Sequence, residues 1–242
     1  MIPMRRSYFI TPIQLILATL TFAGCAATST PNYSEILTNP NRPEAERAID
    51  AVRKPNEVMA FYAVKPGDKV ADIFASRGYY TAILAQLVGV QGVVYSANPA
   101  PRQELHDRLK QPGMSHVRVL DGPFDKLLLP QDGSLDFVLL HLDYHEIAGA
   151  VRGAMNKRIF GALRPGGSYG VVDHSAKEGA GDSVAKTLHR MDKQLVIKEA
   201  TSVGFRLAEE GKMLSRAEDT RDFSVVKIRD RSDRFVLKFV KP

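Results

Sequence analysis

The chain has 242 residues and a formal net charge of +6, and 25% of its residues are charged while 44% are hydrophobic. This composition excludes an intrinsically disordered chain, and the length is sufficient to bury the core of one large domain without disulfide support. A single cysteine excludes an intramolecular disulfide. The basic residues are scattered, without a run of five or six Lys and Arg, so we expect no nucleic-acid partner.

The N-terminal segment is typical of an export signal. Arg5 and Arg6 precede an apolar run from Ile13 to Ala23, and small residues stand directly before Cys25. This order predicts a signal peptide over residues 1–24 rather than a spanning helix, because the run is too short to cross a bilayer. The Ala-Gly-Cys ending resembles the bacterial lipobox, which implies lipidation of Cys25 and an exported protein of the cell envelope, lipid-anchored and facing the periplasm. The alternative is a signal cleaved elsewhere, with an incidental free thiol.

Residues 25–41 are rich in Thr, Ser, Asn and Pro and predict a flexible tether, which leaves one domain over residues 42–242. Within this domain, short apolar runs alternate with segments of helical periodicity. The predicted strands are Lys69–Phe74, Gly92–Ala97, His116–Leu120, Asp136–Leu140, Ser168–Val172, Arg206–Glu209 and Arg234–Val240. The predicted helices are Glu44–Val52, a short helix capped by Asn56 and ending at Tyr62, Tyr79–Val88, Arg102–Lys110, Ile147–Leu163 and Val184–Val203. Apolar strands separated by helices indicate an α/β fold with a mostly parallel sheet and helices on both faces.

Four segments of the domain carry a resemblance to a known family. They are KPGDKVADIFASRGYYTAIL over 65–84, GVVYSANP over 92–99, LPQDGSLDFVLL over 129–140 and GALRPGGSYGVVDHS over 161–175. In this order and spacing they resemble class I S-adenosylmethionine-dependent methyltransferases, and within that superfamily a bacterial group of predicted methyltransferases. The resemblance implies a Rossmann-like sheet of seven strands with the last strand antiparallel. It also implies a cofactor site over the carboxyl ends of the strands, where the strand order reverses.

The loop after the first predicted strand departs from the superfamily pattern. That pattern is an acidic residue followed by three alternating glycines, which let backbone amides approach the cofactor. Asp72 and Gly78 match it, whereas Phe74 and Ser76 occupy the first two glycine positions. Arg77 could pair with the methionyl carboxylate of the cofactor.

The next two predicted strands supply the other cofactor contacts that the resemblance implies. Asn98 stands where the superfamily has an acid that accepts both ribose hydroxyls, and it lacks the charge for that contact. Asp121 is the candidate for the adenine contact, with Asp125 as the alternative. Because the motif is altered at several positions, we expect S-adenosylmethionine to bind weakly.

Polar side chains follow the predicted fourth and fifth strands. Metal-dependent O-methyltransferases place an Asp after the fourth strand and an Asp-Asn pair after the fifth, so Asp143, Asp173 and His174 imply a divalent metal site by resemblance. Without a metal, His145 or His174 could act as general base, because imidazole titrates near neutral pH. His189, on the predicted long helix, could face the same pocket. The alternative is that these groups only hydrogen-bond the surrounding loops.

Two functions follow from the sequence. The first is methyl transfer to an unknown small molecule. The second is a non-catalytic binding protein of the cell envelope that retains the methyltransferase fold. The polar cluster at the strand ends favours the enzyme. The altered loop and the export signal favour the binding protein, because S-adenosylmethionine is made in the cytosol. A further prediction concerns the charged stretch Arg221–Arg234, which we expect to form a solvated hairpin.

Overall fold

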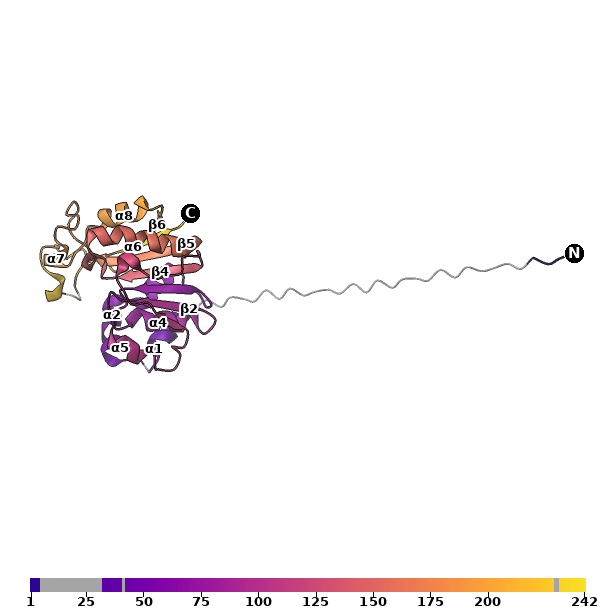
Figure 1. Ribbon diagram of the computed structural model, residues 1–242. Helices are drawn as coiled ribbons and strands as arrows, with labels where there is room; N and C mark the ends of the chain where they lie inside the picture. Colours follow the sequence, from indigo (N-terminus) through magenta and orange to yellow (C-terminus); the bar gives the residue numbers. More distant parts are fainter. Residues whose placement is uncertain (5–31, 41, 229–230) are drawn as a thin grey trace.

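Seven strands form one sheet in the order β3-β2-β1-β4-β5-β7-β6 (Figure 1). They are β1 (Lys69–Ile73), β2 (Val93–Ala97), β3 (Val117–Val119), β4 (Leu135–His141), β5 (Leu163–His174), β6 (Arg206–Gly211) and β7 (Arg234–Val240). The first five pair in parallel, and β7 runs antiparallel to both of its neighbours, β5 and β6. This computed structural model, which describes residues 1–4, 32–40, 42–228 and 231–242, confirms the predicted Rossmann-like sheet.

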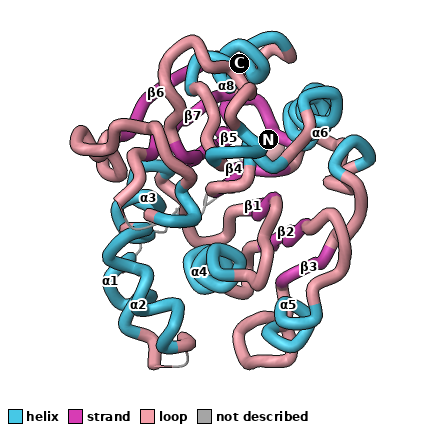
Figure 2. The backbone as a smooth tube through the Cα atoms, turned by 90° about the vertical axis from the view of Figure 1, so that its left-hand side faces the viewer, coloured by secondary structure: helices cyan, strands magenta, loops and turns pink. Residues whose placement is uncertain are grey.

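Helices cover both faces of the sheet (Figure 2). They are α1 (Tyr33–Thr38), α2 (Glu44–Arg53), α3 (Pro55–Tyr62), α4 (Tyr79–Val88), α5 (Gln103–Arg108), α6 (Gly149–Ala162), α7 (Ala185–Leu188) and α8 (Lys193–Ser202), with 3-10 turns η1 (Phe124–Lys126), η2 (Tyr144–Glu146) and η3 (Val225–Lys227). Helices α6 and α8 lie on one face, and α1 to α4 lie on the other. Among the described residues, no helix is long and apolar enough to cross a membrane.

The two faces are buried by alternate residues of the same strands. In β4, Val138 and Leu140 pack into the cluster that contains α6 and α8, whereas Phe137 and Leu139 pack against α3 and α4. This period of two explains why the strands contain unbroken apolar runs, since both faces are covered. The strand ends are therefore the part of the sheet at which polar side chains can gather.

The start of the domain differs from the prediction. Tyr33–Thr38, assigned to the flexible tether over 25–41, form helix α1, in which Asn32 Oδ1 accepts from the Glu35 backbone N–H at 3.3 Å. Ile36 and Leu37 pack against the core cluster that contains α3 and α4. The tether prediction is wrong for these residues, because one short helical turn carries too few apolar positions to show a period. Cys25 and the predicted signal peptide's apolar run lie outside the described residues.

Two predicted helices also differ. Helix α3 begins at Pro55, after Lys54 in a left-handed conformation, so Asn56 is not its cap. Proline favours the first helical position because its missing N–H is not needed there. The long helix predicted over Val184–Val203 is broken into α7 and α8. His189, at the break, has a φ of 53°.

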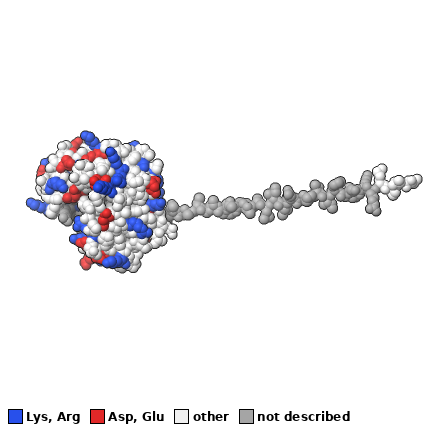
Figure 3. Space-filling model, viewed as in Figure 1, with Lys and Arg blue, Asp and Glu red and all other residues white. Residues whose placement is uncertain are grey.

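Acidic and basic side chains are interspersed on the face of the molecule that Figure 3 presents. The excess of basic residues is therefore not gathered into a single patch on that face. Ion pairs also form at the protein surface, as Arg164 Nε does with Asp136 Oδ1 at 2.7 Å. Such exposed pairs contribute little to stability.

Candidate functional site

A cavity of about 900 Å³ lies over the carboxyl ends of β1, β4 and β5. Its volume is within the range of small-molecule sites, and its position at the reversal of strand order is where this class of fold binds ligands. One end is walled by α2, the loop after β1 and the start of α4. The other end is walled by the segments after β4 and β5, with four histidines: His141, His145, His174 and His189.

The loop after β1 has the backbone of a glycine-rich loop although two of its glycines are replaced. Phe74, Ser76 and Gly78 have φ angles of 61°, 54° and 84°. These three positions are those of the glycines in the superfamily pattern, and left-handed backbone is costly for residues with a Cβ. The third position needs glycine for space as well, because a Cβ on Gly78 would lie 2.8 Å from the Leu105 side chain. The altered sequence therefore keeps the loop's shape.

Phe74 and Asp121 lie toward the β3 side of this loop. The Phe74 ring packs on the Phe124 ring, with centroids 5.3 Å apart. Asp121 Oδ2 is 3.3 Å from His106 Nε2, and its Oδ1 is buried without a hydrogen-bond partner among the described residues. Asp121 is thus a polar group that a ligand amino group could satisfy, whereas the alternative Asp125 is exposed.

Asn98 is not available to a ligand. It is fully buried; its Oδ1 accepts from the Ser76 backbone N–H at 2.7 Å, and its Nδ2 donates to the Ser76 carbonyl at 3.2 Å. The expected ribose contact by Asn98 is therefore replaced by a clamp that holds the left-handed backbone of Ser76. An Asp at this position would place a carboxylate oxygen against the Ser76 carbonyl, so it would not restore the superfamily site.

Asp72, at the end of β1, is a buried acid beside the cavity. Its Oδ2 accepts from the Thr81 hydroxyl at 2.6 Å, and that hydroxyl also lies 2.9 Å from Ser96 Oγ. Burial raises the pKa of Asp72 to about 6, although the bonds from Thr81 and the charge of Arg53 oppose the rise. Asp72 is the predicted acid of the cofactor loop, and it anchors the start of α4.

Arg53 is a cation in the cavity wall that sequence reasoning missed. It lies at the end of α2, with its guanidinium carbon 4.5 Å from the Tyr79 ring centroid, and it has no hydrogen bond or ion pair among the described residues. Arg77, proposed for the cofactor carboxylate, also borders the cavity, but it is mostly exposed and pairs with Glu104 at 3.3 Å. The only sequence signal for Arg53 is its place directly before the Lys54-Pro55 turn.

Two further polar atoms in the cavity wall lack partners. Tyr80 Oη and His141 Nε2 are both buried without a hydrogen bond among the described residues, and their rings lie 4.4 Å apart. Burial and the nearby charges of Arg53 and Arg234 hold the pKa of His141 well below its usual value. Buried polar groups are normally satisfied, so these atoms are candidates for ligand contacts.

His145 and Asp173 form a buried pair at the other end of the cavity. His145 Nδ1 is 2.8 Å from Asp173 Oδ1, and the His145 backbone N–H donates to Asp173 Oδ2 at 2.8 Å. Burial alone would lower the pKa of His145, but the Asp173 carboxylate, with Glu146 and Asp143, raises it above its usual value. Asp173 also accepts from the His174 backbone N–H at 2.8 Å. This network joins the segments that follow the paired strands β4 and β5.

The predicted metal ligands do not form a ligand set. Asp173 is fully buried and both of its oxygens accept hydrogen bonds, and in the part of the chain that the structure describes Asp143, Asp173 and His174 do not have metal-ligand spacing. Burial raises the pKa of Asp143 to about 7, with the charges of Asp173 and Glu146 adding to the effect. Among the described residues, a different group has metal-like spacing, namely His145, Glu146 and His189. Glu146 was not singled out from the sequence, although it directly follows His145.

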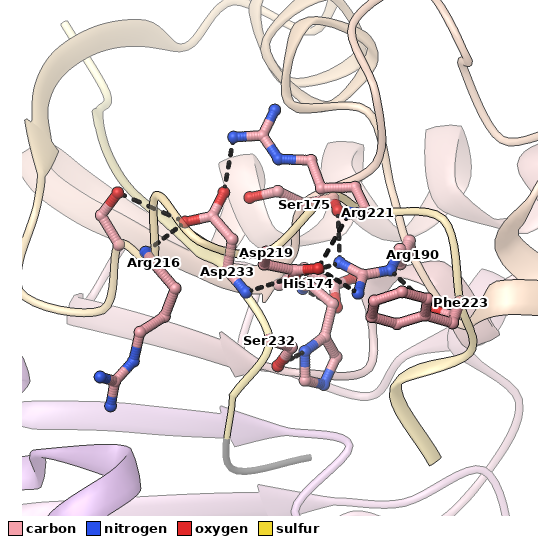
Figure 4. Close-up of polar contacts among 11 residues, drawn as sticks. His174, Ser175, Arg190, Arg216, Asp219, Arg221, Phe223, Ser232 and Asp233 are labelled. Atoms are coloured by element: carbon pink, nitrogen blue, oxygen red, sulfur yellow. Dashed lines mark hydrogen bonds and ion pairs between the residues drawn. The ribbon is translucent and has the colours of Figure 1, made fainter. Parts of the chain in front are cut away.

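A buried ion pair fixes the segments around His174 and His189 (Figure 4). Arg190 donates to both oxygens of Asp219 at 2.8 and 3.0 Å and to the Ser175 carbonyl at 2.8 Å, and both charged side chains are fully buried. Asp219 also accepts from the Asp233 backbone N–H at 2.6 Å. The prediction of a solvated hairpin over Arg221–Arg234 is wrong for the described residues of this stretch, because 221–228 contain the turn η3 and no strand, and Ser232, Asp233 and Arg234 are buried.

His174 is held by the same region. Its Nδ1 lies 2.8 Å from the hydroxyl of Ser232, which directly precedes Asp233. The ring borders the cavity, and its centroid is 6.0 Å from that of His145. The two histidines proposed from the sequence are thus brought together, each supported by a different partner.

The chain is similar in sequence to two curated archaeal proteins over part of its length. It is 33% identical over 78 residues to a protein-L-isoaspartate O-methyltransferase of Ignicoccus hospitalis, a match that covers 27% of this chain and 37% of that protein. It is 32% identical over 82 residues to the protein of the same name from Methanococcus aeolicus, which covers 29% and 38%. The matches span well under half the length of these relatives. No family model matches the chain.

Solved structures resemble the chain over most of its length. An S-adenosylmethionine-dependent methyltransferase from Aquifex aeolicus has a TM-score of 0.62 and 17% identity, with 87% of this chain and 99% of that chain covered. An S-adenosylmethionine-dependent methyltransferase from Mesorhizobium loti has a TM-score of 0.58 and 14% identity, with 78% and 97% covered. At these identities the likeness establishes the fold, which is that of the S-adenosylmethionine-dependent methyltransferases.

Proposed function

We propose that this chain is an S-adenosylmethionine-dependent methyltransferase that acts on a small molecule. The observation that carries the proposal is the loop after β1, whose three left-handed residues keep the shape of a glycine-rich cofactor loop where the glycines are largely replaced. Phe74 and Ser76 adopt a left-handed backbone that only glycine adopts without strain. Such strain is expected where the shape of the loop is needed for binding. The sequence similarity to methyltransferases and the fold support the same function.

The β1 end of the cavity fits the cofactor in its polar groups. Arg53 would pair with the methionyl carboxylate, and the unpartnered Tyr80 Oη and His141 Nε2 lie in the same wall. Asp121 stays the candidate for the adenine amino group, although it does not itself border the cavity. Because Asn98 is engaged with Ser76, the charged contact to the ribose is missing, and we still expect weak binding. When bound, the cofactor supplies a methyl group on a positively charged sulfur.

The histidine end of the cavity would hold the substrate and take its proton. Both ring nitrogens of His145 already face carboxylates, Asp173 at 2.8 Å and Glu146 at 3.2 Å. His174 borders the same end of the cavity, and we propose it as the general base, with Ser232 fixing its ring. Removal of a proton from a hydroxyl, amine or thiol at this end would produce the nucleophile for methyl transfer.

Transfer of labelled methyl groups tests this function. Wild-type protein is incubated with methyl-labelled S-adenosylmethionine and a small-molecule extract of the cell envelope, and products are detected by mass spectrometry. We expect a labelled product whose rate falls at least about 100-fold in His174→Ala, the size typical of a lost general base. His116→Gln is the control, because His116 bonds the Ala85 carbonyl in the core. Cofactor binding without any labelled product would favour the non-catalytic envelope protein instead.

We also propose that the protein is exported and lipid-anchored through Cys25. The support is the arginine-led apolar run and the lone cysteine after small residues. Intact-mass analysis of membrane fractions should find a chain that begins at Cys25 and carries acyl mass, and Cys25→Ser should lose that mass and the membrane association. An unmodified full-length chain in the soluble fraction would contradict the proposal.

A further inference from the structure

We propose that His145, Glu146 and His189 bind a divalent transition-metal ion, represented by Zn²⁺, at the histidine end of the cavity. This set is distinct from the Asp143, Asp173 and His174 set that the sequence predicted. Binding of the ion needs no cofactor, so the inference does not depend on methyl transfer.

The distances between the candidate ligand atoms fit one ion. Glu146 Oε1 lies 3.2 Å from His145 Nε2 and 2.8 Å from His189 Nδ1, and the three atoms are all within 4.8 Å of one another. Ligands about 2.1 Å from one metal ion are about 3.0 Å apart at a right angle and about 3.4 Å apart at the tetrahedral angle. Small side-chain rotations would therefore suffice to coordinate a cation.

Asp173 sets the orientation of the His145 ring. A carboxylate oxygen accepts hydrogen bonds, so the 2.8 Å contact from His145 Nδ1 to Asp173 Oδ1 places the ring hydrogen on Nδ1. His145 Nε2 then faces the Glu146 carboxylate at 3.2 Å, and the position that a proton would bridge is also one that a metal ion can occupy. A carboxylate behind a ligating histidine is the usual support for bound metal.

The backbone conformation of His189 places its side chain beside Glu146. His189 adopts a left-handed φ of 53° between α7 and α8, and the buried Arg190–Asp219 pair follows it directly. If α7 and α8 formed one continuous helix, the side chain of His189 would point in a different direction. Left-handed backbone at a non-glycine residue persists where the surroundings enforce it, and such residues concentrate at functional sites.

The donor set indicates the class of ion and its use. Two imidazole nitrogens and one carboxylate suit Zn²⁺ and its neighbours in the first transition series better than Ca²⁺ or Mg²⁺. Glu146 and His189 border the cavity, so three protein ligands would leave coordination positions open toward it. If the proposed function holds, a substrate oxygen bound at such a position would lose its proton more readily.

A zinc titration of the full chain tests the site without S-adenosylmethionine. Metal-free protein competes with a chromophoric chelator for Zn²⁺, and we expect one ion per chain. Glu146→Gln and His189→Ala should each weaken the affinity by at least about 10-fold. Asp173→Asn replaces the carboxylate behind the His145 ring and should weaken it by about 10- to 100-fold. His106→Ala is the matched control, because His106 also faces a carboxylate, Asp121, at 3.3 Å but lies outside the cluster.

Circular dichroism establishes that each variant is folded, and cobalt absorption gives a second readout on wild type. Co²⁺ bound by the cluster should show ligand-field bands that His189→Ala, which alters a partly exposed residue, removes. Absence of stoichiometric Zn²⁺ binding to wild type, or an equal loss in His106→Ala, would overturn the site. Because no cofactor is present, this result is independent of whether methyl transfer is observed.

Discussion

Individual residues around the cavity hold unfavourable conformations. Of the seven non-glycine residues with positive φ among the described part of the chain, four border the cavity: Phe74, Ser76, Leu142 and His189. Each such residue costs free energy that the rest of the fold must offset. The unpartnered buried atoms of Tyr80 and His141 lie in the same wall. This coincidence is what a binding site produces, since packing alone gives no reason to concentrate strain there.

Asp72 should make stability depend on pH. Its pKa is about 6 in the folded state, against the ordinary value of 3.8 for an aspartate in the unfolded chain. Because the folded-state pKa is the higher one, the contribution of Asp72 to stability is greatest below pH 4 and is lost as the pH rises through 6. The cost above pH 6 is about 3 kcal/mol, since one pKa unit is worth about 1.4 kcal/mol. Asp72→Asn should therefore gain about 1–3 kcal/mol over wild type at pH 8 and little at pH 4.

Urea unfolding at the two pH values measures this difference. Asp125→Asn, at an exposed position, is the control and should change stability by less than about 0.5 kcal/mol at either pH. An equal gain for Asp72→Asn at pH 4 and pH 8 would contradict the assigned role of burial.

At the scale of the secondary-structure elements, the sequence predicts the strands but does not predict the break between α7 and α8. Apolar runs such as β4 are local signals, and six of the seven strands have bounds within two residues of the prediction. The exception is β5, which begins at Leu163, five residues before the predicted start, because residues 163–167 lack a continuous apolar run. The break between α7 and α8 depends on Arg190, whose partner Asp219 lies 29 residues away. Asn98 and Ser76 are likewise 22 residues apart. Such pairings form only in the folded chain, so periodicity and motif spacing could not predict them.

The Arg190–Asp219 pair should be the most sensitive charged contact of these elements. Arg190→Ala leaves a buried carboxylate without its cation, which costs about 3–5 kcal/mol. The exposed pair of Arg164 and Asp136 is the comparison, and Arg164→Ala should cost less than about 1 kcal/mol. Chemical denaturation of both variants measures the two costs. Similar small losses would show that the buried pair does not hold the segments of His174 and His189.

At the scale of the whole molecule, the sequence predicts the fold better than it predicts the roles of the site residues. The parallel sheet places the carboxyl ends of β1, β4 and β5 at one edge, and Asp72, Asp143 and His145 border one cavity there. The same reasoning gave Asn98 and Asp173 ligand roles, and both side chains turn out to be engaged inside the protein. The position of a residue along a strand predicts which residues lie near it. Its hydrogen-bond partners, however, decide whether its side chain remains available to a ligand.

Calorimetric titration of the wild-type protein with S-adenosylmethionine is the most direct test of the central claim that the β1 end of the cavity binds this cofactor. The missing charged ribose contact costs about 1.5–3 kcal/mol, so we predict one-to-one binding about 10- to 100-fold weaker than micromolar. Arg53→Ala should weaken it by a further factor of about 10, and Phe74→Gly with Ser76→Gly should not abolish it, because glycine accepts the same backbone. No binding at about millimolar cofactor, or binding unaffected by Arg53→Ala, would contradict the account.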